Sequence, residues 1–144
     1  MVEQALSCLI TLKLNPDVNK KQADSFLKNL QNNYTLGKAI KKAKENKLLN
    51  ESFQVKLDSF LKERNWLIHK SLAEVQQVFD CYDKRRGIII SLCNRIKEVS
   101  GNAEVIKREI EYDMIDFCET KNRDMSHLRE LVKFQERGVR IYKI

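Results

Sequence analysis

The sequence predicts an all-α protein, a single helical bundle of five or six helices, and three observations support this class. The chain of 144 residues contains one proline and four glycines, so few residues interrupt a helix. Straight-chain residues such as leucine, lysine, glutamate and glutamine, which favour helices, are abundant. Apolar residues recur every three or four positions, the spacing of one helix face. Because no repeat or low-complexity linker is present, we expect residues 1–144 to form one domain.

In the first part of the chain, apolar spacing predicts three helices joined by polar connections. The first should end near the pair Asn15–Pro16, because the residue before a proline disfavours helical geometry. Asp17 is expected to cap the second helix, and Thr35 is expected to open the third.

The strongest helix is predicted over residues 51–69, with Asn50 as its N-cap. The sequence SLAE at 71–74 then forms a capping-box pattern, in which the serine bonds forward and the glutamate reaches back. We therefore expect the chain to bend or restart a helix directly after His69 and Lys70.

The second half of the chain predicts further helices. Residues 72–82 continue a helical pattern, and 83–87 form either a turn or a solvated helical face. The sequence SGN at 100–102 indicates a break. One helix is then expected over 105–117 and a last one over 128–134.

Composition and charge limit the function classes. The formal net charge of +7 favours polyanions such as RNA, DNA or an anionic membrane. No segment approaches the roughly 20 apolar residues that span a bilayer, so we expect no membrane insertion. Four widely spaced cysteines without a CxxC pattern predict reduced, mostly buried thiols in a cytoplasmic protein. No cofactor or metal motif is found, and the acids Asp113, Asp116 and Glu119 are expected to pair with lysines on a neighbouring helix.

The helix over 51–69 carries an unusual set of polar residues. Arg64 lies at the centre of its apolar arc, and a buried guanidinium is costly unless it meets a carboxylate or an anionic ligand. Asn65 and His69 share a face, whereas His69 lies about 140° round the helix from Arg64. Trp66 points away from the arc, which indicates a second contact surface, most economically with a partner subunit. The arc comprises Phe53, Leu57, Phe60, Leu61, Leu67 and Ile68.

The stretch Arg64-Asn65-Trp66-Leu67-Ile68-His69 resembles the signature of the HEPN superfamily, small helical-bundle domains that often act as ribonucleases. The hallmark of that family is an arginine followed, a few residues later, by a histidine. A polar residue commonly comes directly after the arginine. The resemblance rests on roughly residues 53–75 and on the all-helical setting.

This resemblance implies a homodimer whose two motifs line a shared cleft, and metal-independent cleavage of RNA that leaves a 2′,3′-cyclic phosphate. The catalytic residues would be Arg64, which holds the scissile phosphate, His69, which exchanges protons, and Asn65, which orients His69 or bonds to the phosphate. It also implies a toxin or antiviral defence component with an antitoxin or other regulatory protein as partner. Members paired with nucleotidyltransferase antitoxins often carry a tyrosine two residues after the histidine, where this chain has Ser71.

Four further residues are predicted to bind the RNA substrate: Trp66, Lys70, Arg85 and Arg86. The alternative to an endoribonuclease is a non-catalytic helical dimerisation, adaptor or RNA-binding module in which Arg64 and His69 are structural. A DNA-binding regulator is a weaker alternative, because no helix-turn-helix pattern is found. An Arg64 in an open basic cleft would favour the nuclease, and an Arg64 bound to a carboxylate would favour the adaptor.

Overall fold

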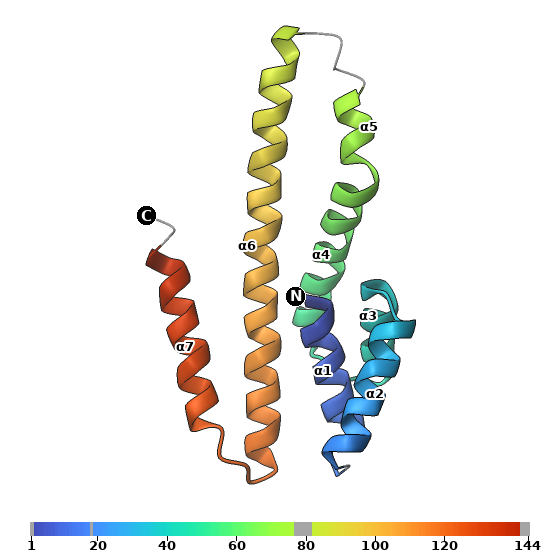
Figure 1. The fold of residues 1–144 in the computed structure, drawn as a ribbon, viewed down its shortest axis with the longest axis vertical. Helices are drawn as coiled ribbons and strands as arrows, with labels where there is room; N and C mark the ends of the chain where they lie inside the picture. Colours follow the sequence, from blue (N-terminus) through green and yellow to red (C-terminus); the bar gives the residue numbers. More distant parts are fainter. Residues whose placement is uncertain (1, 18, 77–81, 142–144) are drawn as a thin grey trace. The chain divides into compact units, whose positions relative to one another are not determined.

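The computed structural model describes residues 2–17, 19–76 and 82–141 (Figure 1). Over these residues the chain is an all-α helical bundle without strands, as predicted. Only Lys70 separates α5 from α4, and if the two are counted together the described residues hold six helices. The helices are α1 (Val2–Leu14), α2 (Lys20–Asn33), α3 (Leu36–Glu45), α4 (Glu51–His69), α5 (Ser71–Gln76), α6 (Tyr82–Thr120) and α7 (Ser126–Ile141).

The chain divides into two compact units. Unit 1 comprises Met1–Ala39 and Lys107–Ile144, and unit 2 comprises Ile40–Ile106. Helices α3 and α6 each begin in one unit and continue into the other. The expectation of one domain over 1–144 stays a prediction.

The core of unit 1 is built around α1, which packs against α2. Leu6, Leu9 and Ile10 are fully buried because their spacing puts them on one face of α1. The predicted first helix is thus confirmed. On the polar side of α1, Lys13 Nζ lies 2.8 Å from a carboxylate oxygen of Asp113 and joins α1 to α6.

Two helix starts in the first part of the chain can be compared with their predicted caps. The cap of α2 is Asn19, not Asp17 as predicted, and its side chain accepts a hydrogen bond from the backbone N–H of Gln22 at 2.9 Å. Thr35 precedes α3, as predicted, and its hydroxyl accepts from the N–H of Lys38 at 3.4 Å. Both side chains satisfy backbone donors that have no partner within the helix.

The core of unit 2 lies between the end of α3, α4 and the first part of α6. Leu57 of α4 is fully buried, with Phe53 and Phe60 close to it on the same face. Figure 1 shows α4 and α5 running alongside this part of α6. The remaining buried apolar residues of unit 2 are Ile40, Ala43, Leu49, Val99 and Ile106.

The predicted break at 100–102 is wrong, because α6 runs without interruption for 39 residues. A glycine in a helix costs only about 1 kcal/mol relative to alanine. Val99 and Ile106 are buried on either side of Gly101, so tertiary packing outweighs this local preference. Residues 83–87 are helical, the second of the two predicted possibilities. Helix α6 ends where Asn122 adopts a φ of 59°, a conformation that asparagine tolerates better than most residues.

The described cysteines are free thiols in different environments. Cys118 is buried, Cys8 is half-buried and Cys93 is exposed, so the prediction of mostly buried thiols is wrong for the described cysteines. Burial raises the pKa of the Cys8 thiol, which keeps it protonated. Cys81 lies outside the described residues.

Asp124 holds the start of α7 and makes this helix end sensitive to pH. Its carboxylate accepts hydrogen bonds from the hydroxyl and the backbone N–H of Ser126, which lower its pKa below the ordinary value of an aspartate. A lowered carboxyl pKa gives stability that is present above the unfolded pKa and is lost as pH falls through the folded pKa. We expect Asp124→Asn to lower the melting temperature at pH 6, and this difference from wild type should vanish at strongly acid pH. Thermal unfolding across a pH series checks it, with the exposed Asp17→Asn as control.

Candidate functional site

The candidate site is at the C-terminal end of α4, and the start of this helix is set by Asn50. The Asn50 side chain accepts a hydrogen bond from the N–H of Phe53 at 2.8 Å, which confirms the predicted N-cap. The predicted apolar arc is buried only in the first part of the helix, at Phe53, Leu57 and Phe60. Leu61 and Leu67 are half-buried and Ile68 is exposed. The C-terminal part of α4 therefore leaves the core and meets solvent.

Glu63 and Trp66 of α4 are joined to α6 by one residue, Arg95. The Nε atom of Arg95 lies 3.3 Å from a carboxylate oxygen of Glu63. Its guanidinium carbon lies 3.7 Å from the centroid of the Trp66 ring, the geometry of a cation–π contact. An intramolecular contact therefore covers one face of the half-buried Trp66, where the sequence suggested a partner subunit. Arg95 was not recognised from the sequence, since its partners lie 29 and 32 positions earlier in the chain.

The three predicted catalytic residues all lie on α4 but do not share one face. Arg64 is half-buried, and Asn65 and His69 are exposed. Because α4 is unbroken from Glu51 to His69, Arg64 and His69 are separated by about 140° round the helix and about 7.5 Å along it. Asn65 and His69 are one turn apart on the same exposed face. Within one chain, α4 brings Asn65 to His69 and holds Arg64 away from it.

The predicted restart directly after the histidine is confirmed. Helix α4 ends at His69, Lys70 is the C-cap, and α5 begins at Ser71. The backbone N–H of Lys70 donates to the carbonyl of Trp66 at 2.9 Å, and its side chain is exposed. The hydroxyl of Ser71 donates a hydrogen bond backward to the carbonyl of Leu67. This bond satisfies one of the carbonyls left open at the end of α4. The predicted reciprocal bonds between Ser71 and Glu74 stay a prediction, because the side chain of Glu74 lies outside the described residues.

Arg85 and Arg86 lie near the start of α6, in the same unit as the motif. Arg85 is half-buried and Arg86 is exposed. The contacts of Arg95 show that α4 and α6 are neighbours, and Figure 1 shows that they run in opposite directions in this unit. The contact of Arg95 with α4 serves as the reference level along both helices. From this level His69 lies about 7 Å toward the C-terminus of α4. Arg86 lies about 14 Å toward the N-terminus of α6, which is the same direction in space because the helices are antiparallel. The two arginines thus lie beyond the histidine, toward α5.

A pocket of about 260 Å³ lies between α4 and α6, on the other side of the Arg95 contact from His69. Its lining is mixed, with two charged side chains, Lys56 and Glu63, beside apolar ones. Arg64 and His69 do not line it. Sequence reasoning missed it because its walls come from two helices far apart in the chain. The remaining lining residues are Ser59, Phe60, Asn102, Val105 and Ile106.

The three acids of α6 all pair with cations of unit 1, but only Asp113 pairs with a lysine, as was predicted for all three. Asp113 binds Lys13, while Asp116 and Glu119 both bind Arg129 of α7. Hydrogen bonds to Glu119 and Asp116 raise the pKa of Arg129. The hydroxyl of Tyr112 lies 3.3 Å from a carboxylate oxygen of Glu136, and desolvation together with this carboxylate raises the pKa of Tyr112. The contacts of Arg129 and of Tyr112 both join α6 to α7. Among the described residues, no group of three or more His, Cys, Asp or Glu side chains is arranged to hold a metal ion.

Comparison with known proteins adds no family to these observations. No protein-family model, curated protein or solved structure matches the chain significantly. In the part of the chain that the structure describes, no helix has both the length and the apolar character needed to cross a membrane.

Proposed function

We propose that the chain is a metal-independent endoribonuclease of the HEPN type that acts as a homodimer. The observation that carries the proposal is the position of His69, exposed as the last residue of α4, with Asn65 on the same face and Arg64 in the preceding turns. A histidine at an open helix end can reach a bound ligand and exchange protons near neutral pH.

In the proposed reaction, His69 takes the proton of the ribose 2′-hydroxyl as this oxygen attacks the adjacent phosphate. The bond from phosphorus to the 5′-oxygen breaks, the leaving oxygen takes a proton from water, and His69 then returns its proton to the solvent. Arg64 binds the phosphate and stabilises the charge that develops on it. Asn65 orients His69. The exposed side chains of Lys70 and Arg86, with Arg85 and Trp66, supply the substrate contacts.

A second copy of the chain enters this proposal for a geometrical reason. Arg64 and His69 of one α4 face different directions, so Arg64 of one protomer and His69 of the other would form each site. Near the motif, Ile68 of α4 and Ile89 and Ile90 of α6 are exposed, at 50, 45 and 51% respectively. Because α4 and α6 are antiparallel neighbours, these isoleucines lie at similar levels along the two helices. They offer apolar surface for a contact between two copies of the chain.

The biological part of the proposal rests on the family resemblance. It is a role as a toxin or antiviral defence component in the cytoplasm, controlled by an antitoxin or other regulatory protein. Because Ser71 stands where a subgroup carries tyrosine, a nucleotidyltransferase partner is not included.

A second candidate function is a non-catalytic adaptor or RNA-binding module. The observation that favours it is the contact of Arg95 with Glu63 and Trp66, which shows that polar residues beside the motif hold α4 to α6. In this function Arg64, which is half-buried, would also serve the packing of α4.

The test is cleavage of a mixed-sequence RNA in the presence of EDTA, followed by analysis of the new ends. The proposal predicts that the full wild-type chain leaves 2′,3′-cyclic phosphates and 5′-hydroxyls, and that the double variant Arg64→Ala/His69→Ala leaves the RNA intact. Arg123→Ala, which removes an exposed arginine between α6 and α7, should cleave like wild type. Equal RNA binding without cleavage by all three proteins would favour the adaptor function.

A further inference from the structure

Helix α7 has two different faces. The face toward α6 carries Arg129, which binds Asp116 and Glu119, and the buried Val132. Glu136, one turn further along the helix, accepts a hydrogen bond from the hydroxyl of Tyr112. These residues follow one another at intervals of three and four, so they occupy a single side of the helix. The opposite side of α7 is left for other contacts.

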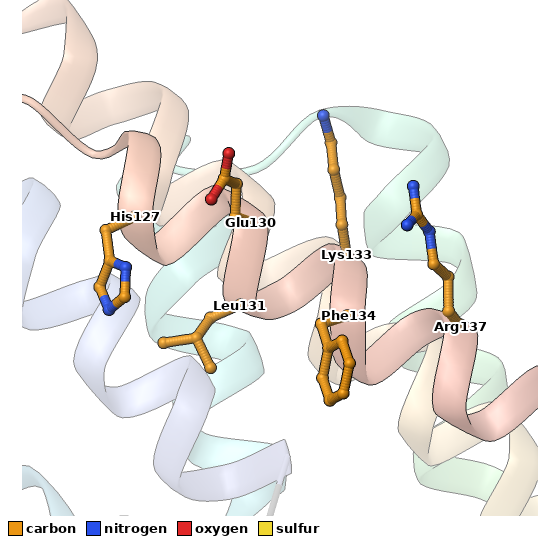
Figure 2. Close-up of a pocket in the computed structure, with 6 residues that line it drawn as sticks. All are labelled: His127, Glu130, Leu131, Lys133, Phe134 and Arg137. Carbon is orange, nitrogen blue, oxygen red and sulfur yellow. The ribbon is translucent and has the colours of Figure 1, made fainter.

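That outward side is apolar and exposed. Leu131 is 41% and Phe134 74% exposed, and Leu128 beside them is 47% exposed. Figure 2 shows Leu131 and Phe134 pointing to the same side of α7, while Glu130, Lys133 and Arg137 point to another. These residues, together with His127, line an open groove of about 570 Å³. A phenylalanine exposed to this degree beside leucines marks an apolar surface whose burial against a partner would lower the free energy.

The charges that border this stripe have a regular spacing. If Leu131 and Phe134 are taken as the a and d positions of a heptad, Glu130 and Arg137 are successive g positions, two turns apart. Leu128 and Gln135 are the e positions on the other border. Both g residues are exposed and carry opposite charges.

We propose that the outward face of α7 binds the same face of a second copy of this chain, with the two α7 helices antiparallel. In an antiparallel pair, g positions of one helix lie beside g positions of the other. Glu130 of each protomer then meets Arg137 of the partner subunit, so the two-fold axis generates two ion pairs. The e positions place Leu128 beside Gln135 of the partner subunit, and Leu131 packs against Phe134 of the partner subunit.

Other arrangements satisfy the charges less well. In a parallel pair, g positions face e positions, so Glu130 would meet the uncharged Gln135 and the ion pairs would be lost. An anionic lipid surface would attract Lys133 and Arg137 but would repel Glu130, which lies on the same border. The alternation of Glu130 and Arg137 therefore favours a copy of the same helix over a membrane. This contact does not involve α4, so it does not depend on the proposed nuclease function.

The test is the self-association of the full chain, measured by sedimentation at increasing protein concentration. Wild type should associate, and Phe134→Glu should abolish the contact made by α7. Glu130→Arg or Arg137→Glu alone places two like-charged pairs in the contact and should weaken association about tenfold or more. The double variant Glu130→Arg/Arg137→Glu restores both pairs with reversed charges and should recover wild-type association. All three substitutions are at exposed positions, and circular dichroism checks that helix content is kept in the four variants.

Three results would overturn the proposal. The first is a wild type that stays monomeric at every concentration. The second is an association that Phe134→Glu leaves unchanged, or that the double charge reversal fails to restore. The third is binding of wild type to vesicles of phosphatidylcholine and phosphatidylglycerol that Phe134→Glu abolishes while the protein remains monomeric, which would assign this face to a membrane.

Discussion

His69→Ala is expected, under the proposed nuclease function, to lower the rate of RNA cleavage by about 10²–10⁴-fold, the usual contribution of a positioned general acid or base. His69 is exposed at the end of α4, so its loss should leave the fold intact and remove only the proton transfer. Arg64→Ala should lower the rate by about 10²–10³-fold, because the transition-state charge loses its guanidinium. Single-turnover cleavage of a labelled RNA measures both rates, with Arg123→Ala as the surface control.

Mixing the two inactive variants tests how the site is built. If each site takes Arg64 from one protomer and His69 from the other, a mixed dimer of Arg64→Ala and His69→Ala keeps one complete site. With random exchange of protomers, activity should return to about one quarter of the wild-type value. Activity that stays at the level of the separate variants, although exchange is shown by labelled protomers, would contradict a site shared between two chains.

The second large effect concerns stability. Leu57→Ala is expected to lower the free energy of unfolding by about 2–5 kcal/mol. Leu57 is fully buried on the core face of α4, so the substitution leaves a cavity. Val55 provides a matched control on the same helix, since it is 68% exposed and Val55→Ala should change the free energy by less than about 0.5 kcal/mol. Urea unfolding followed by circular dichroism compares the two. Similar values for both variants would mean that the core of unit 2 does not lie on the Leu57 face of α4.

Much of the secondary structure could be predicted because its signals are local. The spacing of Leu6, Leu9 and Ile10 predicts α1, and Asn50 predicts the start of α4. The same local reasoning failed at Gly101. A glycine between a serine and an asparagine is typical of a break, but buried residues on either side keep α6 helical.

The candidate site could be predicted only in part. The spacing of Asn65 and His69 on one face follows from helix geometry and holds in the structure. The surroundings of Trp66 could not be predicted in the same way, because Arg95 belongs to another helix. The pocket beside Lys56 and Glu63 was missed for the same reason.

The helical class, the starts of α3, α4 and α5, and the places of Arg64, Asn65 and His69 on α4 could all be predicted from the sequence. These properties depend on residues within a few positions of one another, where backbone geometry and capping act. Long-range packing, by contrast, determines that Arg95 covers one face of Trp66, that α6 is unbroken and that apolar residues of α7 stay exposed. Each of these depends on which distant residues come into contact, and the apolar spacing of a single helix does not specify the surface that will cover it.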